Sequence, residues 1–375
     1  MIRAIWRNWR SKNTESKDDR RVRQYTRAVE IDKPDVLVAA NFLRLGGIKQ
    51  HIEAIQHYSS LAVELVPSEG LMQHVTRNDI ESRFSSALLG MKLPHLKAAH
   101  SHVFPWAIRF AEKWSSSGVR WVHTYHLLYS SEHSLQEMPP WQEEFNSAQL
   151  HTGRHADVCI SVSKWQTELL IAKYGISVQY LPNGVDLKAC AHASARRFHE
   201  KFEISGTFAL FIGRDDPVKN PAEFAEVAAK MSDLQFVMVG RALNEEYLQN
   251  NFGVSSPRNL LFLPEIPHLD ALDAIAACSV LVVTSKREGL PTLILEAMGQ
   301  AKPIVAPREA GCSEALGGGD YGYLYELGDV EELKAQIIQA MTDTERPIRA
   351  YQRVTEHYDW RVIAPQLDQI YLGNC

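Results

Sequence analysis

The sequence has little cysteine, no long apolar run and no apolar N-terminal segment. Its five cysteines are scattered along the chain, at Cys159, Cys190, Cys278, Cys312 and Cys375. No pair has the spacing of a zinc or redox motif, so a reducing compartment is expected. No apolar run approaches the ~20 residues of a membrane span. Arginines at 3, 7 and 10 interrupt the N-terminus, which lacks the apolar core expected of a signal peptide. We therefore expect a cytoplasmic protein.

A strong charge of either sign is also absent. The net charge of −5 provides no bulk attraction to nucleic acid. A hydrophobic content of 45% with 23% charged residues is that of a globular protein with sizeable cores. The length of 375 residues suits two domains of ordinary size.

The glycine pattern near the N-terminus is incomplete for a dinucleotide site. An apolar run at residues 35–40 predicts a buried strand, and Gly46-Gly47 follow it before a predicted helix. Such a turn lets a backbone come close to a ligand. Because the third glycine of the dinucleotide fingerprint is missing, a nicotinamide oxidoreductase is the weaker interpretation.

The most informative stretch runs from residue 278 to residue 316. An apolar run at 279–284 predicts a strand, 285–289 a polar turn, and Pro291 the first residue of a helix. A second strand at 303–307 closes the unit. Backbone N–H groups are unpaired at such a helix start, beside a partial positive charge, which makes it a ready site for a phosphate.

Two glutamates bracket this helix start. Glu288 lies on the turn, and Glu296 shares a helix face with Thr292 and Leu293, roughly 7 Å along the axis at ~1.5 Å per residue. Carboxylates accept hydrogen bonds from hydroxyl pairs well. Acids are common in this chain, so the spacing alone is weak, but Gly-Leu-Pro between the two acids makes the pattern specific. It predicts a site for a nucleotide joined to a polyol.

Two cations follow the first strand of the second half. The run at 208–213 predicts a strand, and Arg214 and Lys219 lie on the loop at its carboxyl end. Two cations there can neutralise a departing diphosphate, a task otherwise given to a divalent metal. The alternative is a pair of solvated surface cations. No Asp-x-Asp metal motif is evident.

Histidines gather near the predicted strands at 98–102 and 120–124. His126 follows the second strand at its carboxyl end, where parallel sheets place ligands. Alternation points His123 to the opposite face, which favours a structural role. His100 and His102, at the end of the preceding strand, are weaker candidates for the lining of a cleft.

Glu288-Gly289-Leu290-Pro291, with Glu296 after seven intervening residues, resembles the signature of retaining nucleotide-sugar glycosyltransferases of family 4. The resemblance covers roughly residues 35–370. It implies the glycosyltransferase-B fold, an α/β fold in which two doubly wound Rossmann-like domains face each other across a cleft. The domains expected are a basic N-terminal tail at 1–30, an acceptor-binding domain at 31–188, a nucleotide-sugar-binding domain at 189–355, and a helix at 356–375 that crosses back.

The resemblance also implies residue roles. His126 matches the active-site histidine, Arg214 and Lys219 the diphosphate-binding pair, and Gly46-Gly47 a loop across the cleft from the donor phosphates. Asn220 stands where a glycine is usual. The catalytic set implied is His126, Glu288, Arg214 and Lys219. The donor-binding set implied is Gly46, Gly47, Arg214, Lys219, Glu288, Gly289, Leu290, Pro291, Thr292, Leu293 and Glu296. The nucleobase is expected near residues 262–266.

The activity implied is transfer of a hexosyl group from a UDP- or GDP-sugar to a hydroxyl acceptor, with retention and without a metal or other cofactor. Surface polysaccharide, lipopolysaccharide or glycolipid synthesis is the expected context. A basic stretch at residues 2–12, with Ile2, Ile5, Trp6 and Trp9 at helical spacing, is a candidate contact with an anionic membrane at the inner face, although a frayed tail is favoured. Two alternatives stay open: a nucleotide-sugar epimerase or hydrolase on the same fold, and a non-catalytic sugar-nucleotide-binding protein.

Overall fold

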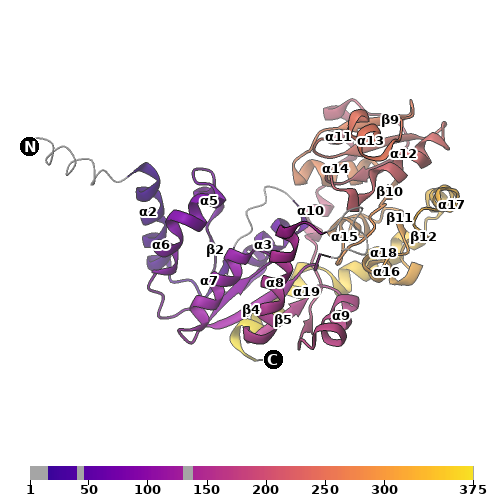
Figure 1. Cartoon of the computed structure of the whole chain (residues 1–375). Coiled ribbons are helices and arrows are strands. Elements are labelled where there is room, and N and C mark those ends of the chain that lie inside the picture. Colours follow the sequence, from indigo (N-terminus) through magenta and orange to yellow (C-terminus); the bar gives the residue numbers. More distant parts are fainter. Residues whose placement is uncertain (1–15, 40–45, 130–137, 375) are drawn as a thin grey trace, which may run out of the picture.

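A computed structural model describes residues 16–39, 46–129 and 138–374, which form two lobes (Figure 1). Each lobe is built around a six-stranded sheet in which every pairing is parallel. Helices link the strands of each sheet, as in doubly wound α/β proteins. The predicted fold class, two Rossmann-like domains facing across a cleft, is confirmed.

The first sheet has the strand order β2-β1-β3-β4-β5-β6. Its strands are β1 (Val36–Ala39), β2 (Val63–Val66), β3 (Ala98–Ser101), β4 (Arg120–Tyr125), β5 (Val158–Ser161) and β6 (Gln179–Tyr180). The central strands β1 and β3 are buried along their whole length, because helices cover both faces.

The second sheet has the order β12-β11-β10-β7-β8-β9. Its strands are β7 (Phe208–Ile212), β8 (Gln235–Val239), β9 (Leu260–Leu263), β10 (Val280–Val282), β11 (Ile304–Pro307) and β12 (Tyr323–Tyr325). Strands β7 and β10 lie side by side, so the loops that follow them emerge together at one edge of the sheet.

The helices of the first half precede or connect the strands of the first sheet. They are α2 (Lys17–Asp32), α3 (Gly47–Tyr58), α4 (Glu69–Met72), α5 (Arg77–Asp79), the π-helical η1 (Ile80–Phe84), α6 (Ser85–Leu89), α7 (Pro105–Ser115), α8 (Pro140–His155) and α9 (Lys164–Tyr174).

The helices of the second half surround the second sheet, except for the last. They are α10 (Leu187–Ala191), α11 (Ala195–Phe202), the 3-10 turn η3 (Pro217–Lys219), α12 (Pro221–Ala229), α13 (Glu245–Phe252), α14 (His268–Ala277), α15 (Thr292–Met298), α16 (Ala310–Ala315), the 3-10 turn η4 (Gly317–Gly319), α17 (Val330–Thr342), α18 (Arg346–His357) and α19 (Trp360–Leu372).

The predicted N-terminal tail is wrong in its second half. Helix α2 begins after Ser16, whose side chain forms a capping box with Asp19. Val22 and Val29 are buried in the core of the first lobe, and the Tyr25 hydroxyl donates to the Leu65 carbonyl at 2.7 Å. This helix therefore belongs to the first domain, because its apolar residues recur at helical spacing among the charged ones. The predicted membrane contact at residues 2–12 lies outside the described residues.

The last helix, α19, leaves the second lobe and packs on the first. It contacts α3 and β4, and the Asp368 carboxylate accepts hydrogen bonds from the hydroxyls of Ser59 and Ser60 at 2.5 and 2.7 Å. At its start, the Trp360 ring packs directly on Gly184 in the segment between the lobes. The chain thus joins the two lobes at two places.

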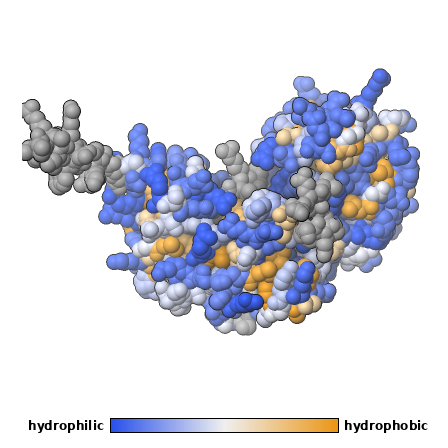
Figure 2. All heavy atoms as spheres, viewed as in Figure 1, coloured by the Kyte–Doolittle hydropathy of each residue, from blue (hydrophilic) through white to orange (hydrophobic). Residues whose placement is uncertain are grey.

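On the face that Figure 2 shows, most of the surface of the described residues is hydrophilic, with apolar residues in patches. Within the described part of the chain, none of the helices has the length and apolar character needed to cross a membrane.

Candidate active site

A cavity of about 370 Å³ lies between the two domains. Its walls are the loops that follow β1 and β4 in the first domain and β7, β8, β9 and β10 in the second. Parallel α/β sheets place ligands at this end of the strands. The catalytic and donor-binding residues that the resemblance implied all line this cavity: Gly46, Gly47, His126, Arg214, Lys219, Glu288, Gly289, Leu290, Pro291, Thr292, Leu293 and Glu296.

The predicted helix start is displaced by one residue. Pro291 is the N-cap and keeps an extended backbone, with φ −72° and ψ 111°, so the helix α15 begins at Thr292. The helix ends at Met298, and its buried face includes Ile294 and Leu295. The N–H groups of Thr292 and Leu293 belong to the first turn, which has no preceding helical carbonyl to accept them.

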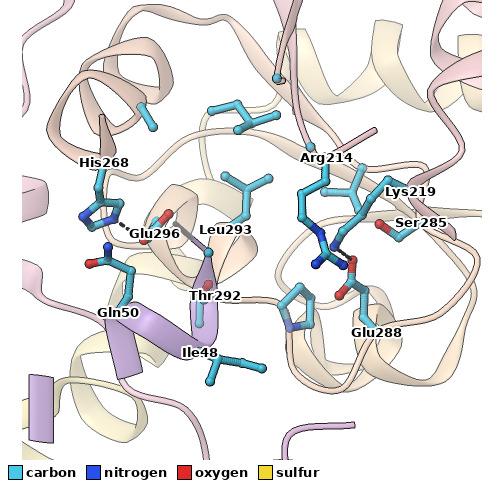
Figure 3. Close-up of a pocket in the computed structure, with 18 of the residues that line it drawn as sticks. Ile48, Gln50, Arg214, Lys219, His268, Ser285, Glu288, Thr292, Leu293 and Glu296 are labelled. Atoms are coloured by element: carbon cyan, nitrogen blue, oxygen red, sulfur yellow. Dashed lines mark hydrogen bonds and ion pairs between the residues drawn. The ribbon is translucent and has the colours of Figure 1, made fainter. Parts of the chain in front are cut away.

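Lys219 and Glu288 meet inside the cavity. Lys219 Nζ donates to Glu288 Oε1 at 2.6 Å, and both side chains are largely shielded from solvent (Figure 3). The two loops are fixed to each other, because the Thr284 hydroxyl donates to the Lys219 carbonyl at 2.9 Å and the Lys286 amide to the Val218 carbonyl at 2.8 Å. The cation and the acid therefore reach the same point from separate strands.

Arg214 extends beside Lys219 on the same side of the cavity (Figure 3). Its guanidinium pairs with Asp216 at 3.0 Å and its side chain is 56% exposed, so it is available to a ligand. Asn220, where a glycine is usual in the resembling family, has φ 50° and ψ 53°. Asparagine tolerates this left-handed conformation better than most residues.

Glu296 is held by a histidine that the sequence analysis missed. His268, the first residue of α14, brings its Nε2 to 2.7 Å from Glu296 Oε1 (Figure 3). Burial lowers the pKa of His268, but the hydrogen bond to Glu296 and the charges of Glu296, Asp186 and Glu53 outweigh it, and the net pKa is raised. The side chain of Gln50, from α3 in the first domain, lies next to this pair (Figure 3).

The glycine loop of the first domain faces the start of α15. Gly46 has φ 119°, a conformation that side chains rarely adopt. A Cβ on Gly47 would stand 3.0 Å from the Thr292 hydroxyl, which is tighter than ordinary contact. The two domains therefore approach each other closely across the cavity at this point. The expected strand end and loop at residues 40–45 lie outside the described residues.

His126 lines the cavity from the first domain and is 7% exposed. Burial, with the neighbouring His51, His100 and His123, holds its pKa well below the usual range, so the ring is neutral. A neutral imidazole can accept a hydrogen bond from a hydroxyl at one nitrogen or donate to one at the other.

His100 and His102, the weaker candidates for the lining of the cleft, do not line the cavity. His100 is buried, with its ring nitrogens 2.6 Å from the Tyr371 hydroxyl and 2.8 Å from the Thr124 hydroxyl. His102 lies behind His126, with its Nδ1 3.0 Å from His126 Nε2. His123 is fully buried against Ser101 at 2.9 Å, in line with the structural role expected.

The acidic motif is anchored to the first domain through its backbone. Trp165 Nε1 donates to the Gly289 carbonyl at 2.8 Å, and Asn183 Nδ2 donates to the Leu290 carbonyl at 2.8 Å. Gly289 also lies so close to the His126 carbonyl that a Cβ would overlap it. These contacts hold the turn that contains Gly289 and Leu290 against the first domain, next to His126.

The far end of the cavity is lined by Glu265 and Ile266, together with Val239 and Gly240. Two residues of the range expected to contact a nucleobase thus reach the cavity, whereas Phe262 packs against the apolar core of the second domain instead.

Two family models match the chain. Residues 83–189 match "Glycosyltransferase Family 4" and residues 195–357 match "Glycosyl transferases group 1". One match falls on each domain.

Curated relatives at low identity are also glycosyltransferases. A phosphatidyl-myo-inositol mannosyltransferase of Mycobacterium leprae is 26% identical over 71% of this chain and 69% of that protein. The counterpart from Mycolicibacterium smegmatis is 28% identical over 56% of this chain, and the match spans about half of its length, 54%. A D-inositol 3-phosphate glycosyltransferase of Corynebacterium urealyticum is 23% identical over 81% of this chain and 78% of that protein.

Solved structures share the fold. The Anabaena protein Alr3699/HepE, in complex with UDP and glucose, superposes with a TM-score of 0.71 at 18% identity, covering 91% of this chain and 99% of that chain. Sucrose-phosphate synthase from Thermosynechococcus elongatus superposes with a TM-score of 0.70 at 17% identity, covering 90% of this chain and 98% of that chain.

Proposed function

We propose that this chain, a glycosyltransferase of the two-domain glycosyltransferase-B type, moves a hexosyl group from a nucleoside diphosphate sugar to a hydroxyl of a glycan or lipid-linked acceptor, with retention of anomeric configuration. One observation carries the proposal. Arg214 and Lys219, the start of α15 and the acids Glu288 and Glu296 come from separate elements and line the same cavity.

The charges of the cavity match the parts of such a donor. Arg214 and Lys219 offer two cations to the diphosphate, and the first turn of α15 offers backbone N–H groups. Glu296 offers a carboxylate to the paired hydroxyls of the ribose. Glu288, at the other flank, offers one to the hydroxyls of the sugar. The nucleobase then lies toward Glu265 and Ile266.

The reaction breaks the bond between the anomeric carbon and the diphosphate oxygen, and that oxygen keeps the electron pair. Charge therefore accumulates on the diphosphate in an oxocarbenium-like transition state, where Lys219 and Arg214 stabilise it. The acceptor oxygen bonds to the anomeric carbon on the same face, and its proton passes to the leaving phosphate. His126, neutral and at the cavity wall, orients a hydroxyl of the sugar or acceptor. No step requires a metal, so we expect that EDTA does not lower the rate.

The relatives support a choice of donors and acceptors to test first. A mannosyltransferase acting on phosphatidyl-myo-inositol and a structure holding UDP and glucose make UDP- or GDP-hexoses the first donors to test. The same relatives make an inositol-containing lipid or a surface glycan the first acceptor class to test. We infer that the protein works in glycolipid or surface polysaccharide synthesis, in the cytoplasm or at the inner face of the membrane.

The test begins with a thermal-shift screen against UDP-, GDP- and ADP-sugars, because a tight ligand raises the melting midpoint by mass action. The donor found is then incubated with and without candidate acceptors, and the anomeric configuration of the product is read by NMR. We expect glycoside formation that depends on acceptor. Equal consumption of donor without acceptor would instead identify a hydrolase or epimerase. If no sugar nucleotide shifts the melting midpoint, the proposal that the cavity binds such a donor is wrong.

A further inference from the structure

Three buried histidines converge beside the donor cavity. His51 comes from α3, His102 from the end of β3 and His126 from the end of β4. One ring nitrogen of each lies within 4.8 Å of those of the other two. Among the residues that the structure describes, this is the one group of three or more histidine, cysteine or acidic side chains gathered so closely.

Hydrogen bonds within the described part of the chain do not account for this cluster. Neither ring nitrogen of His51 has a hydrogen-bond partner, and Nε2 of His102 has none either. Buried polar atoms are normally paired, so several orphaned nitrogens in one place need an explanation. A shared ligand would account for one of the two unpaired nitrogens of His51.

The donor set is of a kind that a metal takes. A neutral imidazole carries one nitrogen lone pair, and cations of the zinc class bind neutral imidazole. Three histidines whose ring nitrogens lie within 4.8 Å of one another therefore offer ligands suited to such an ion.

The spacing is close to that of a tetrahedral site. A Zn–N distance of about 2.0–2.1 Å places two ligand nitrogens about 3.3 Å apart. His102 Nδ1 and His126 Nε2 are already 3.0 Å apart, held by a shared proton. For both nitrogens to bind an ion, that proton moves to the other nitrogen of the ring that carries it, and no ring changes charge. A ring nitrogen of His51 lies within 4.8 Å of both and completes the set by moving closer to them.

A supporting group is present as well. Asn183 lies beside His51, and its Oδ1 is buried without a hydrogen-bond partner, whereas its Nδ2 is fixed on the Leu290 carbonyl. Histidine ligands commonly donate their second ring N–H to a carbonyl oxygen, which fixes the ring. Asn183 Oδ1 is placed to accept that bond from His51.

We propose that His51, His102 and His126 form a binding site for one divalent transition-metal ion of the Zn²⁺ class, and that occupation inhibits the enzyme. His126 is the member that lines the cavity, and an ion on its Nε2 fixes the ring proton on Nδ1, so the ring can no longer accept a hydrogen bond from a substrate hydroxyl. The metal-free protein is the active form. The inhibition rests on the proposed function, but the binding of the ion does not, so the two are measured separately.

Binding is tested on untagged full-length protein that has been stripped with EDTA and dialysed. Co²⁺ is titrated while the visible absorption of the tetrahedral ion is followed, and Zn²⁺ is titrated by calorimetry. We expect one ion per chain. His51→Asn and His102→Asn should each weaken Zn²⁺ binding by more than about 100-fold, and Asn183→Ala, which removes only the supporting group, by about 10–100-fold. His74→Asn, at an exposed histidine outside the cluster, is the matched control and should bind as the wild type does.

X-ray absorption of the wild-type zinc complex keeps the test valid if a variant fails to fold. Three imidazole nitrogens at about 2.0 Å are expected in the first shell. Sulfur ligands, or binding that survives both histidine substitutions, would overturn the site, as would the absence of saturable binding by the wild type. Transfer activity is then assayed with and without one equivalent of Zn²⁺. Zinc that binds at the three histidines and leaves transfer unchanged would overturn the inhibition alone.

Discussion

Lys219 Nζ and Glu288 Oε1 lie 2.6 Å apart and join the loop after β7 to the loop after β10. In the proposed reaction Lys219 holds the leaving diphosphate and Glu288 orients the sugar, so the two charges neutralise each other before the donor arrives. A donor that places its anomeric carbon between these groups breaks their direct contact. Its diphosphate then contacts Lys219 and its sugar contacts Glu288. The pair keeps both side chains in position within the cavity, and removing one partner leaves the other charge half-buried.

Glu288→Gln keeps the shape of the side chain and removes its charge. We expect kcat to fall by about 10²–10³-fold, because the carboxylate acts on the reacting sugar, whereas the Kd of the nucleoside diphosphate changes by only a few-fold. Steady-state kinetics and calorimetry measure the two quantities. Glu246→Gln, at an exposed position of α13, is the control. Equal losses in kcat and in nucleotide affinity would show that Glu288 contacts the nucleotide instead.

Lys219→Met removes the cation with little change in apolar volume. We expect weaker binding of the nucleoside diphosphate and a further loss in kcat, because the developing charge on the diphosphate loses its partner. Lys219→Arg should recover binding better than turnover, since the guanidinium restores the charge but not the point geometry of the ammonium. Nucleotide affinity that is unchanged in Lys219→Met would place the diphosphate elsewhere.

The sequence predicted well which residues of the second domain meet in one cavity. Arg214 and Lys219 directly follow an apolar strand run, and Glu288 and Glu296 flank a turn with a specific Gly-Leu-Pro pattern. These residues are close in sequence to the strands that position them. The order of apolar runs and turn residues along the chain was therefore enough to predict where they lie. The sequence placed Pro291 at the first helical position, whereas it is the N-cap, one residue earlier. Either position of the proline is followed by the same spacing of apolar residues, so the sequence does not distinguish them.

The contacts that sequence could not predict join segments far apart in the chain. His268 meets Glu296 because α14 packs against α15, and nothing in the residues around His268 indicates that packing. The same holds for Trp165 on the Gly289 carbonyl, and for His51 next to His126. Strand alternation separated His126 from His123 correctly, but it had no bearing on His102, which follows the adjacent strand and lies behind His126 rather than in the cavity.

Glu296→Ala and His268→Ala should both weaken nucleotide binding, and their effects should not add. His268 fixes the carboxylate that is proposed to hold the ribose, so most of its effect disappears once the carboxylate is gone. A double-mutant cycle measured by calorimetry should give a coupling free energy of about 0.5–3 kcal/mol. Affinities for a ribonucleotide and its 2′- and 3′-deoxy forms locate the contact, because the deoxy compounds should lose less in Glu296→Ala than the ribonucleotide does. Strictly additive effects would show that His268 does not act on nucleotide binding through Glu296.

The His268–Glu296 pair should make stability depend on pH in one direction. The folded pKa of His268 is raised above the unfolded value of about 6.5, so the folded protein holds the proton more tightly than the unfolded chain. The stabilisation is therefore fully present below about pH 6.5 and is lost as pH rises through the folded pKa. The difference in melting midpoint between the wild type and His268→Gln should shrink between about pH 6 and pH 9. A constant difference would mean that the ring stays in one protonation state throughout.

Gly289→Ala should impair catalysis through the fit between the domains. A Cβ at Gly289 would overlap the His126 carbonyl, and backbone cannot move aside as a flexible side chain does. The motif turn must then withdraw from the first domain, which weakens the hydrogen bond from Trp165 to the Gly289 carbonyl and pulls Glu288 away from His126. We expect a large fall in kcat/KM with a smaller change in nucleotide affinity, because the diphosphate and ribose contacts stay within the second domain. Gly70→Ala, at a helical glycine whose Cβ would meet nothing within 4 Å, is the matched control and should leave both quantities unchanged. Small-angle scattering of the Gly289→Ala protein would show a larger radius of gyration if the lobes separate. Wild-type activity in Gly289→Ala would mean that the reaction does not need the domains as closely apposed as they are here.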